Sequence, residues 1–316
     1  MSRPAATAGR PDVDVAGAYG SAPDGGAADG NAPDSDACGE AGPAGVGPLA
    51  AGDAASGPVR LLIAYHGAPF HGWQIQSSVE TVEGALTDAV AQLLGRRVKV
   101  QGASRTDAGV HALGQVACFE DGGRHTPEVY VRALNRLTPR GIAVVHADRS
   151  VGPFHPRHDA RGKQYRYRIQ EGYAVSPLLA DRTWHHAGQL DVAAMDEAAG
   201  ALVGEHDFSS FRAAGCDAAS PVRVIRRVRV RRVDEGPLGR VVEVEIAGSA
   251  FLKYMVRNIV GTLITVGRGR RPAEWVGEVL RARDRGAAGV TAPAHGLVLE
   301  RIHYPLQPFP AAPILG

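Results

Sequence analysis

Side chains that can do chemistry stand close together in one short segment of this 316-residue chain. The segment begins at Gly102 and runs Gly-Ala-Ser-Arg-Thr-Asp-Ala-Gly-Val-His-Ala, which places Arg105, Asp107 and His111 within seven residues. A carboxylate near guanidinium groups can act as a nucleophile or a base, because the positive charge keeps it ionised at neutral pH. Asp-Ala-Gly is also typical of a simple turn, since Asp bonds its own backbone two residues on. The segment by itself leaves both interpretations open.

The residues around this segment predict strands and a helix that would position it. Residues 97–101 are expected to form a strand leading into the loop, and residues 116–119 a strand leading out of it. Residues 59–65 are apolar and β-branched, which also predicts a strand. The apolar residues of 82–94 recur at helical spacing between an N-cap threonine and a closing glycine. The segment is therefore expected to be a tight loop mounted on strands.

The second half of the chain again alternates strands with helices. Residues 163–169 alternate cleanly, which predicts a strand with Tyr165 and Tyr167 on one face and two arginines on the other. Residues 205–212 are expected to form a loop. A hairpin is predicted from 222–233 and 240–246, and six arginines of its first arm could pair in part with glutamates of the second.

One predicted helix carries a charge inside an apolar stretch. Residues 251–266 have an apolar stripe at helical spacing that is interrupted by Arg257 and Asn258. A guanidinium among apolar residues is costly unless it is paired, and a buried carboxylate is its obvious partner. The pair would either be structural or would keep a carboxylate such as Asp107 ionised for chemistry.

The charge of the chain is unevenly divided. The whole chain carries 35 basic and 33 acidic residues, and its segment 1–57 holds two of the basic and eight of the acidic ones. Residues 58–316 therefore carry 33 basic and 25 acidic residues, a net charge of +8 with neutral histidines. A basic body indicates an anionic partner such as nucleic acid, although an ordinary arginine-rich enzyme surface would give the same count.

These patterns together indicate an α+β fold. We expect two similar lobes that form a mainly antiparallel sheet, with helices on one face and a central basic cleft between the lobes. Residues 1–57 are predicted to be a disordered acidic tail rich in Ala, Gly and Pro. Residues 58–150 would form an N-terminal catalytic lobe carrying the Asp107 loop, and residues 151–316 a C-terminal lobe that completes an RNA-binding cleft.

Other chemistries find less support in the sequence. The three cysteines have no spacing typical of disulfides or of a zinc knuckle, which suits the cytosol, and no apolar run is long enough to span a membrane. Two groups, His155-x-x-His158 and Glu205-His206-Asp207, are weak candidates for metal ligands. The chain has no Gly-x-Ser-x-Gly elbow, phosphate-binding loop or dinucleotide fingerprint.

The segment from Gly102 closely resembles the catalytic motif of the tRNA pseudouridine synthase A (TruA) family. Five further matches follow the family's order and span about residues 60–305, nearly the whole predicted folded body. One such motif is moderately specific, whereas six in order form a specific signature. The five are Tyr65 with Gly67 and Gly72-Trp-Gln-x-Gln76, Gln164-Tyr-Arg-Tyr167, Asp207-Phe-Ser-Ser-Phe-Arg212, Met255-Val-Arg-Asn-Ile-Val-Gly261, and Gly296-Leu-Val-Leu299.

The resemblance implies an isomerase that converts uridine to pseudouridine at positions 38–40 in the anticodon stem-loop of tRNA. Asp107 would be the catalytic aspartate that attacks the target uridine, whose base detaches, rotates and rejoins through carbon. Tyr165 would stack on the target base and assist proton removal at C5. Arg257 would pair with Asp107, and Arg105 would help hold the place of the flipped-out nucleotide. The resemblance further implies a cytoplasmic homodimer that uses no metal and no organic cofactor.

The sequence departs from the family's pattern at a few positions. His66 stands where the family usually has Asp, and Pro156, His158 and Asp159 replace the more usual Ala, Phe and Ser of their loop. A non-catalytic tRNA-binding protein or chaperone is the alternative function, although a pure binder has no need of Asp107 together with Arg257. A metal-dependent phosphoesterase that uses the histidine loops is a third, weaker alternative.

Overall fold

A computed structural model describes residues 57–236, 239–305 and 309 of the chain. They belong to one compact unit. The prediction of a disordered acidic tail therefore lies, apart from its last residue, outside the described residues.

The first half of the described chain packs two helices against a small antiparallel sheet. The helix α1 begins where the backbone N–H of Gly84 donates to the Thr81 hydroxyl, and it ends at Gly95, whose φ of 69° is left-handed. Both ends agree with the prediction. The elements are β1 (Val59–Tyr65), α1 (Val82–Leu94), β2 (Gln101–Gly102), β3 (His111–Phe119), α2 (Pro127–Leu137) and β4 (Ile142–Arg149).

The second half contains the longer strands and three further α-helices. The arm of the predicted hairpin that carries the arginines and the arm that carries the glutamates pair in antiparallel register. The elements are β5 (Gly162–Glu171), β6 (Trp184–His186), α3 (Val192–Gly200), β7 (Gly204–Asp207), η1 (Ser209–Phe211), β8 (Val222–Asp234), β9 (Arg240–Gly248), α4 (Met255–Gly267), α5 (Trp275–Ala282), η3 (Arg285–Ala287), η4 (Ala294–Gly296) and β10 (Leu297–His303).

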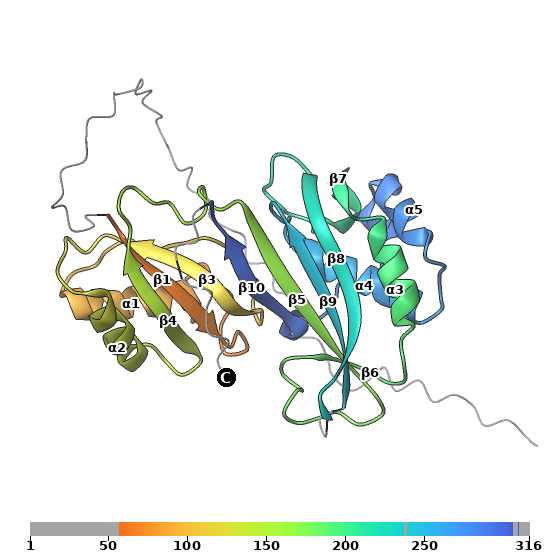
Figure 1. Ribbon diagram of the computed structural model, residues 1–316, viewed down its shortest axis with the longest axis horizontal. Coiled ribbons are helices and arrows are strands. Elements are labelled where there is room, and N and C mark those ends of the chain that lie inside the picture. The colour runs from red at the N-terminus through yellow and green to blue at the C-terminus, as the bar shows by residue number, and fades with distance from the viewer. Residues whose placement is uncertain (1–56, 237–238, 306–308, 310–316) are drawn as a thin grey trace, which may run out of the picture. The chain divides into compact units, whose positions relative to one another are not determined.

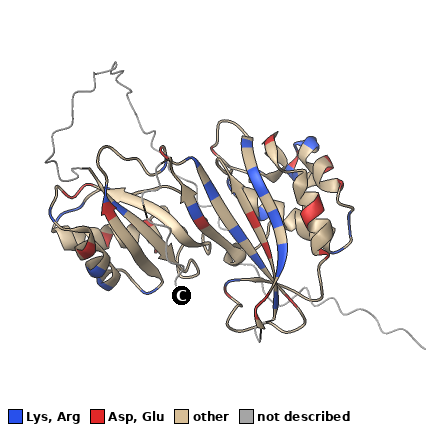
Figure 2. Ribbon diagram, in the orientation of Figure 1, with Lys and Arg blue, Asp and Glu red and all other residues tan. Residues whose placement is uncertain are grey.

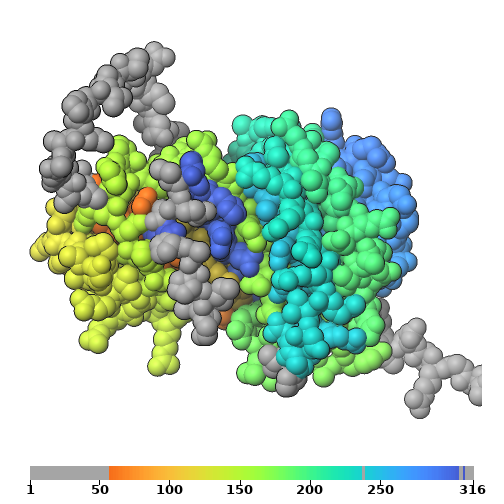
Figure 3. Space-filling model, in the orientation of Figure 1, coloured from red at the N-terminus to blue at the C-terminus, as the bar shows by residue number. Residues whose placement is uncertain are grey.

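The strand β10 joins the two halves into one sheet. It runs parallel to β3, with Val298 opposite His111, and antiparallel to β5, with Leu299 opposite Tyr165. The resulting order is β4-β1-β3-β10-β5-β9-β8-β7, with β2 beside β3 and β6 beside β5 (Figure 1). In Figure 3 the dark blue surface of β10 lies between the two halves. This mixed, mostly antiparallel sheet and its helices confirm the predicted α+β fold, whereas the proposed domain limits and the basic cleft remain predictions.

The pleat of β5 separates two kinds of side chain. Tyr165 and Tyr167 are buried on one face, and Arg166 and Arg168 lie on the opposite face, as the alternation predicts. The blue and red bands along β5, β8 and β9 in Figure 2 mark the charged residues of these strands. Because Arg166 stands opposite Glu245 in the register, the arginines and glutamates share the face turned away from Tyr165.

Half of the arginines in β8 are neutralised by glutamates. Glu243 is 3% exposed and accepts hydrogen bonds from Arg231 at 2.7 Å and Arg166 at 3.2 Å. Arg227 pairs with Glu245 at 3.6 Å, and Arg232 pairs with Glu171 of β5 at 2.7 Å. The predicted pairing with glutamates of the second arm is confirmed for two of the six arginines, Arg227 and Arg231, whereas Arg232 pairs with Glu171 of β5.

Two predicted elements are wrong in kind or extent. The strand expected over 97–101 is only the two residues of β2, because Gln101 and Gly102 alone find partners on β3. The expected loop over 205–212 begins inside the edge strand β7, which pairs with β8, and then forms η1. Both errors concern pairing with the next strand along the chain, which the propensity of a short segment does not contain.

A third error concerns the start of a helix. The segment 251–266 was expected to be helical throughout, but α4 begins only at Met255. Tyr254 has a left-handed backbone, with a φ of 60°, so the residues before it cannot continue the helix. Among the residues that the structure describes, no helix combines the length and the apolar character needed to cross a membrane.

Candidate active site

The loop that carries Asp107 connects β2 to β3 and is fixed to the segment that precedes α1. The backbone N–H of Trp73 donates to the carbonyl oxygen of Thr106 at 3.1 Å. The backbone N–H of Gly109 donates to the carbonyl oxygen of Phe70 at 3.3 Å. Gly109 has a φ of +77°, a conformation that favours glycine. Because the loop is anchored on both sides of Asp107, its carboxylate is presented from a defined backbone.

Side chains of the Tyr65–Gln76 motif complete this mount. The Tyr65 hydroxyl lies 2.8 Å from the Thr106 hydroxyl, and both side chains are buried. The Trp73 ring packs so closely on Gly102 that an added Cβ would lie 2.3 Å from a ring carbon. The Tyr65–Gln76 motif and the motif that begins at Gly102 lie on either side of α1 in the sequence, and they form one structural unit.

The structure brings Arg257 to Asp107. Its Nη1 donates to Oδ2 of Asp107 at 3.3 Å, and the two side chains are 14% and 28% exposed. Its Nε also donates to the carbonyl oxygen of Ala292 at 2.7 Å, and its guanidinium lies 4.5 Å from the centre of the Tyr254 ring. A partly exposed carboxylate beside a fixed positive charge can stay ionised and still reach a ligand.

Tyr165 is buried in the same region. Its hydroxyl lies 3.0 Å from the Ser104 hydroxyl, and its ring meets Phe251 edge to face with 5.1 Å between centroids. Burial raises the pKa of Tyr165 to about 12, which the Ser104 hydrogen bond counters in part and the nearby charge of Asp107 reinforces. At 6% exposure neither ring face is open to a base in this conformation, so stacking would require Phe251 or its neighbours to move.

Arg105 takes a different position from Arg257. Its side chain is exposed, as suits contact with a nucleotide. Its positive charge acts on Glu83 in the first turn of α1, where burial raises the pKa of that carboxyl and Arg105 opposes the rise. Asp107, Arg257 and Tyr165 thus form one group, and Arg105 stands at the surface of the same loop.

His111 and His66 lie beneath the loop. The backbone N–H of Gly67 donates to Nδ1 of His111 at 3.0 Å, so its Nε2 carries the proton and donates to the carbonyl oxygen of His295 at 3.0 Å. His66 replaces the family's usual Asp, and its Nε2 lies 2.8 Å from Oδ2 of Asp181. His66 thus connects β1 to the segment between β5 and β6.

Two residues at this site were not singled out from the sequence. Ser104 stands between Tyr165 and Lys163, whose Nζ donates to the Ser104 hydroxyl at 3.0 Å. The alternation of β5 was the available signal, because it places Lys163 on the same face as Tyr165. The serine lies inside the Gly102 motif, but no local pattern indicates what its hydroxyl contacts.

The weak metal candidates have other roles in the fold. Nδ1 of His155 accepts the backbone N–H groups of Arg157 and His158, which closes a local turn. Asp207 accepts the backbone N–H and the hydroxyl of Ser209 at the start of η1. Within the described residues, no group of three His, Cys, Asp or Glu side chains is placed to hold a metal ion.

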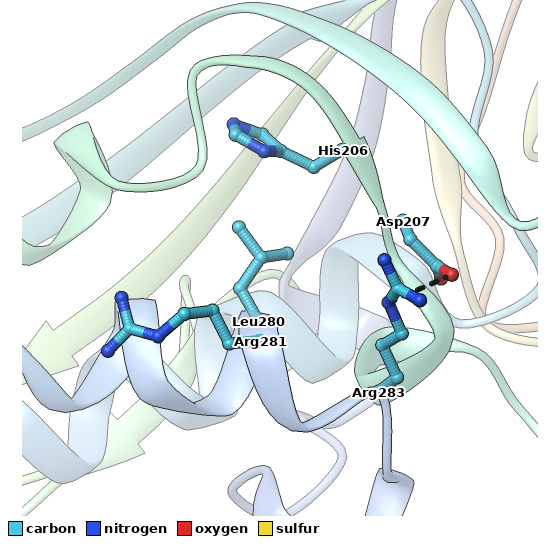
Figure 4. A pocket seen from close by; sticks show the side chains of 5 residues that line it. All are labelled: His206, Asp207, Leu280, Arg281 and Arg283. Atoms are coloured by element: carbon cyan, nitrogen blue, oxygen red, sulfur yellow. Dashed lines mark ion pairs between the residues drawn. The ribbon is translucent and has the colours of Figure 1, made fainter.

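A hollow of about 260 Å³ lies between β7 and the end of α5, away from these contacts. Its lining includes His206, Asp207 and Arg283, and Arg283 reaches Asp207 at 3.4 Å (Figure 4). None of its lining residues belongs to the group around Asp107. The candidate site at Asp107 is therefore defined by the contacts and charges of the side chains around Asp107, and not by this hollow.

Comparison with known proteins identifies the family of this chain. Residues 61–157 and 198–305 match the model of a family described as tRNA pseudouridine synthase. Proteins named tRNA pseudouridine synthase A from Myxococcus xanthus and Ralstonia nicotianae are 48% and 46% identical to this chain. The alignments cover 78% of this chain and 91% and 90% of those relatives.

A relative of the same name from Acetivibrio thermocellus is 43% identical over 78% of this chain and 99% of its own length. The structure of an archaeal box H/ACA sRNP Nop10-Cbf5 complex aligns with 79% of this chain and 48% of its own, at 11% identity and a TM-score of 0.35, a likeness too weak to carry an argument. The family match covers more than half of the chain, and the relatives align over nearly their whole length. The chain belongs to the tRNA pseudouridine synthase family, among relatives named tRNA pseudouridine synthase A.

Proposed function

We propose that this chain isomerises uridine to pseudouridine in the anticodon stem-loop of tRNA, with Asp107 as its catalytic aspartate. The observation that carries the proposal is the pair formed by Asp107 and Arg257 at 3.3 Å, across 150 residues of sequence. A turn former needs no such partner, whereas a nucleophile needs its carboxylate ionised and within reach. Membership of the family supplies the reaction to which this pair is suited.

The other residues of the site take the roles that the family resemblance implies, and their positions support these roles. Arg257 holds the Asp107 carboxylate ionised, and its bond to Ala292 keeps it in place when a nucleotide enters. Tyr165 contacts the target base and takes part in removing its C5 proton. Arg105 is exposed on the same loop and holds the place of the displaced nucleotide. A paired base must leave the helix stack before any side chain can reach it, so such a placeholder has a physical purpose.

Three finer features rest on the family resemblance and stay predictions. They are the choice of uridines 38–40, a homodimeric state and a cytoplasmic location. Mapping pseudouridine in one tRNA before and after incubation with the protein tests the first. Light scattering during size-exclusion chromatography tests the second, and fractionation of the source cells tests the third.

The central test is the Asp107→Asn variant, incubated with unmodified tRNA that carries a uridine in the anticodon arm. Asn keeps the size of the side chain but removes the carboxylate charge. We expect pseudouridine formation to fall below detection, while the Kd for tRNA stays within about threefold because one charge contributes little to the binding of a polyanion. Asp88→Asn is the matched control, since Asp88 on α1 forms an exposed ion pair with Arg97.

Two outcomes would contradict the proposal. Full turnover by the Asp107→Asn variant would show that Asp107 is not the catalytic aspartate. Tight tRNA binding by the unaltered protein without any product would favour a non-catalytic tRNA-binding protein or chaperone.

A further inference from the structure

A lysine that the proposed reaction does not use lies next to Tyr165. Lys163 and Tyr165 are two residues apart on β5 and therefore on the same face of the sheet. The Nζ of Lys163 lies 3.0 Å from Oγ of Ser104, and this Oγ lies 3.0 Å from the Tyr165 hydroxyl oxygen. The three polar groups form one continuous hydrogen-bonded chain.

The middle member of this chain is firmly positioned. Ser104 is buried, and its backbone N–H donates to Oε1 of Gln115 at 3.2 Å while its carbonyl oxygen accepts from Nε2 of the same side chain at 2.6 Å. Gln115 lies on β3 and is fully buried. The serine hydroxyl is thus held between Tyr165 and Lys163 by the sheet itself.

We propose that Lys163 is a positioning residue that acts through Tyr165: it receives, by way of Ser104, the proton that leaves Tyr165 when this tyrosine takes the C5 proton of the target base. This inference rests on the proposed function. It adds an acceptor for the proton that isomerisation must remove from C5.

The proton transfer balances as follows. After C5 of the base has bonded to C1′ of the ribose, C5 carries that bond and its original hydrogen. The C5–H bond breaks, and its electron pair forms the C5=C6 double bond. A second electron pair leaves C6 at the same time. It goes to N1, which then takes a proton from water. If the Asp107 carboxylate is bonded to C6, the electron pair instead returns to that carboxylate. The C5 proton goes to Oη of Tyr165, the tyrosine proton to Oγ of Ser104, and the serine proton to the lone pair of Lys163.

The charge states of the two end groups suit this direction of transfer. Because the pKa of Tyr165 is raised to about 12, its hydroxyl keeps its proton at neutral pH and is a poor base unless that proton can leave. Burial, with a contribution from the positive charge of Arg157, lowers the pKa of Lys163 to about 8. A general base works best when its pKa is near the working pH, which this amine satisfies.

The composition of the chain also makes this lysine unusual. Of the 35 basic residues only Lys99, Lys163 and Lys253 are lysines, and the other 32 are arginines. An arginine cannot lose its proton in a protein, whereas a buried lysine can. The residue beside Ser104 is thus one of the few basic residues of this chain that can accept a proton. Because Lys163 is largely but not fully buried, the ammonium can return its proton to solvent.

The test compares Lys163→Met, Lys163→Arg and Ser104→Ala under single-turnover conditions with saturating tRNA. One substrate carries ordinary uridine at the target position, and the other carries uridine with deuterium at C5. For the unaltered protein we expect a rate that rises with pH up to about 8 and a small deuterium effect. For Lys163→Met and Ser104→Ala we expect rates about 100-fold lower, a larger deuterium effect and no such pH dependence.

Lys163→Arg separates proton acceptance from simple charge, because arginine keeps the charge but cannot accept a proton. We expect it to be as slow as Lys163→Met. The exposed Lys99→Met is the matched control and should keep the unaltered rate. All three site variants should bind tRNA with a Kd within about threefold of the unaltered protein. Only Lys163→Met loses a charge, and a single charge contributes little to the binding of a polyanion.

The outcomes distinguish this inference from the proposed function. If the unaltered protein makes pseudouridine and Lys163→Arg keeps its rate, or the deuterium effect is unchanged in Lys163→Met, the relay is wrong and the function stands. If the unaltered protein makes no pseudouridine, the function is wrong and the relay falls with it. An independent readout is the NMR shift of the Tyr165 ring carbon that bears the hydroxyl. It should titrate with Lys163 near pH 8 and lose this step in Ser104→Ala.

Discussion

Arg257 is held in place by contacts that do not involve Asp107. Its bond to the Ala292 carbonyl and its position over the Tyr254 ring fix the guanidinium before any nucleotide binds. A charge that is already oriented need not reorganise when the carboxylate reacts, which is how a preorganised site lowers a barrier. In the proposed reaction, the partly exposed Asp107 would leave the pair, while Arg257 would stay to stabilise the charge that develops.

His111 gives a test of the same loop through stability. Its Nδ1 accepts the Gly67 N–H, so protonation of this nitrogen would break a buried hydrogen bond. Burial lowers the pKa of His111, and the neighbouring His66 imidazole lowers it further, while Asp181 acts in the opposite sense. The unfolded chain then binds the proton first as the pH falls. The stabilising contribution of neutral His111 is present above about pH 6.5 and is lost below it.

We expect His111→Asn to flatten the pH dependence of unfolding. The amide oxygen of Asn can accept the Gly67 N–H but does not titrate. The free energy of unfolding, measured by urea denaturation, should fall less between pH 7.5 and pH 5.5 in the variant than in the unaltered protein. Measurement at pH 8, where His111 is neutral in both states, gives the baseline cost of the substitution. If the free energy of unfolding depended on pH equally in both proteins, protonation of His111 would not destabilise the fold.

At the scale of elements, one buried ion pair connects the end of β3 to β4 and α2. Asp121 accepts both Nη groups of Arg149 at 2.7 Å, together with the hydroxyl of Tyr130 and the backbone N–H of Gly123. Burial alone would raise the pKa of Asp121, but the hydrogen bonds from Arg149, Tyr130 and Gly123 outweigh it and hold the pKa well below its ordinary value. The contribution of this pair is therefore complete above about pH 4 and is lost only in acid.

We expect Asp121→Asn to lower the free energy of unfolding by about 3–5 kcal/mol, because the Asp121 carboxylate is fully buried and its charge holds Arg149, which is 15% exposed. Asp148→Asn is the matched control. Asp148 holds Arg60 with the same two 2.7 Å bonds and Arg60 is 17% exposed, but the Asp148 carboxylate is itself 23% exposed. That variant should cost about 1 kcal/mol or less, since water can replace the bond. Equal losses in urea denaturation would contradict the assignment of the difference to burial.

At the scale of the whole molecule, the arginine ladder of β8 does not serve the Asp107 site directly. Arg227, Arg229 and Arg231 lie on the sheet face turned away from Tyr165, and half of the six arginines are paired. The net charge of +8 on residues 58–316 still attracts a polyanion, because a long-range field depends on the sum of charges. The segment 1–57 opposes this field with a net charge of −6, from two basic and eight acidic side chains.

We expect a chain that starts at residue 58 to keep its pseudouridine-forming rate within a few-fold at saturating tRNA. Its Kd for tRNA should be lower than that of the full chain, most clearly at low salt, because the acidic residues no longer compete with RNA. A filter-binding series across a range of salt concentrations measures this difference. A Kd that is the same for both proteins at every salt concentration would show that the segment 1–57 does not compete.

Features that depend on neighbours in the chain could be predicted from the sequence. The motif around Asp107, the caps of α1 and the alternation of β5 could be recognised locally. Dihedral preferences, capping and periodicity act over a few residues, so local sequence contains them. The resemblance to the TruA family rested on the same short motifs, and the family match confirmed it.

Which of these residues meet depends on how the strands and loops pack in three dimensions. Arg257 was expected near a carboxylate, but its bond to Ala292 depends on the path of the chain from α5 to β10. The chain from Lys163 through Ser104 to Tyr165 and the contact of His66 with Asp181 join residues that lie far apart in the sequence. These contacts follow from the insertion of β10 between β3 and β5. Sheet register is fixed by the burial of whole strands, and no single segment of sequence contains that information.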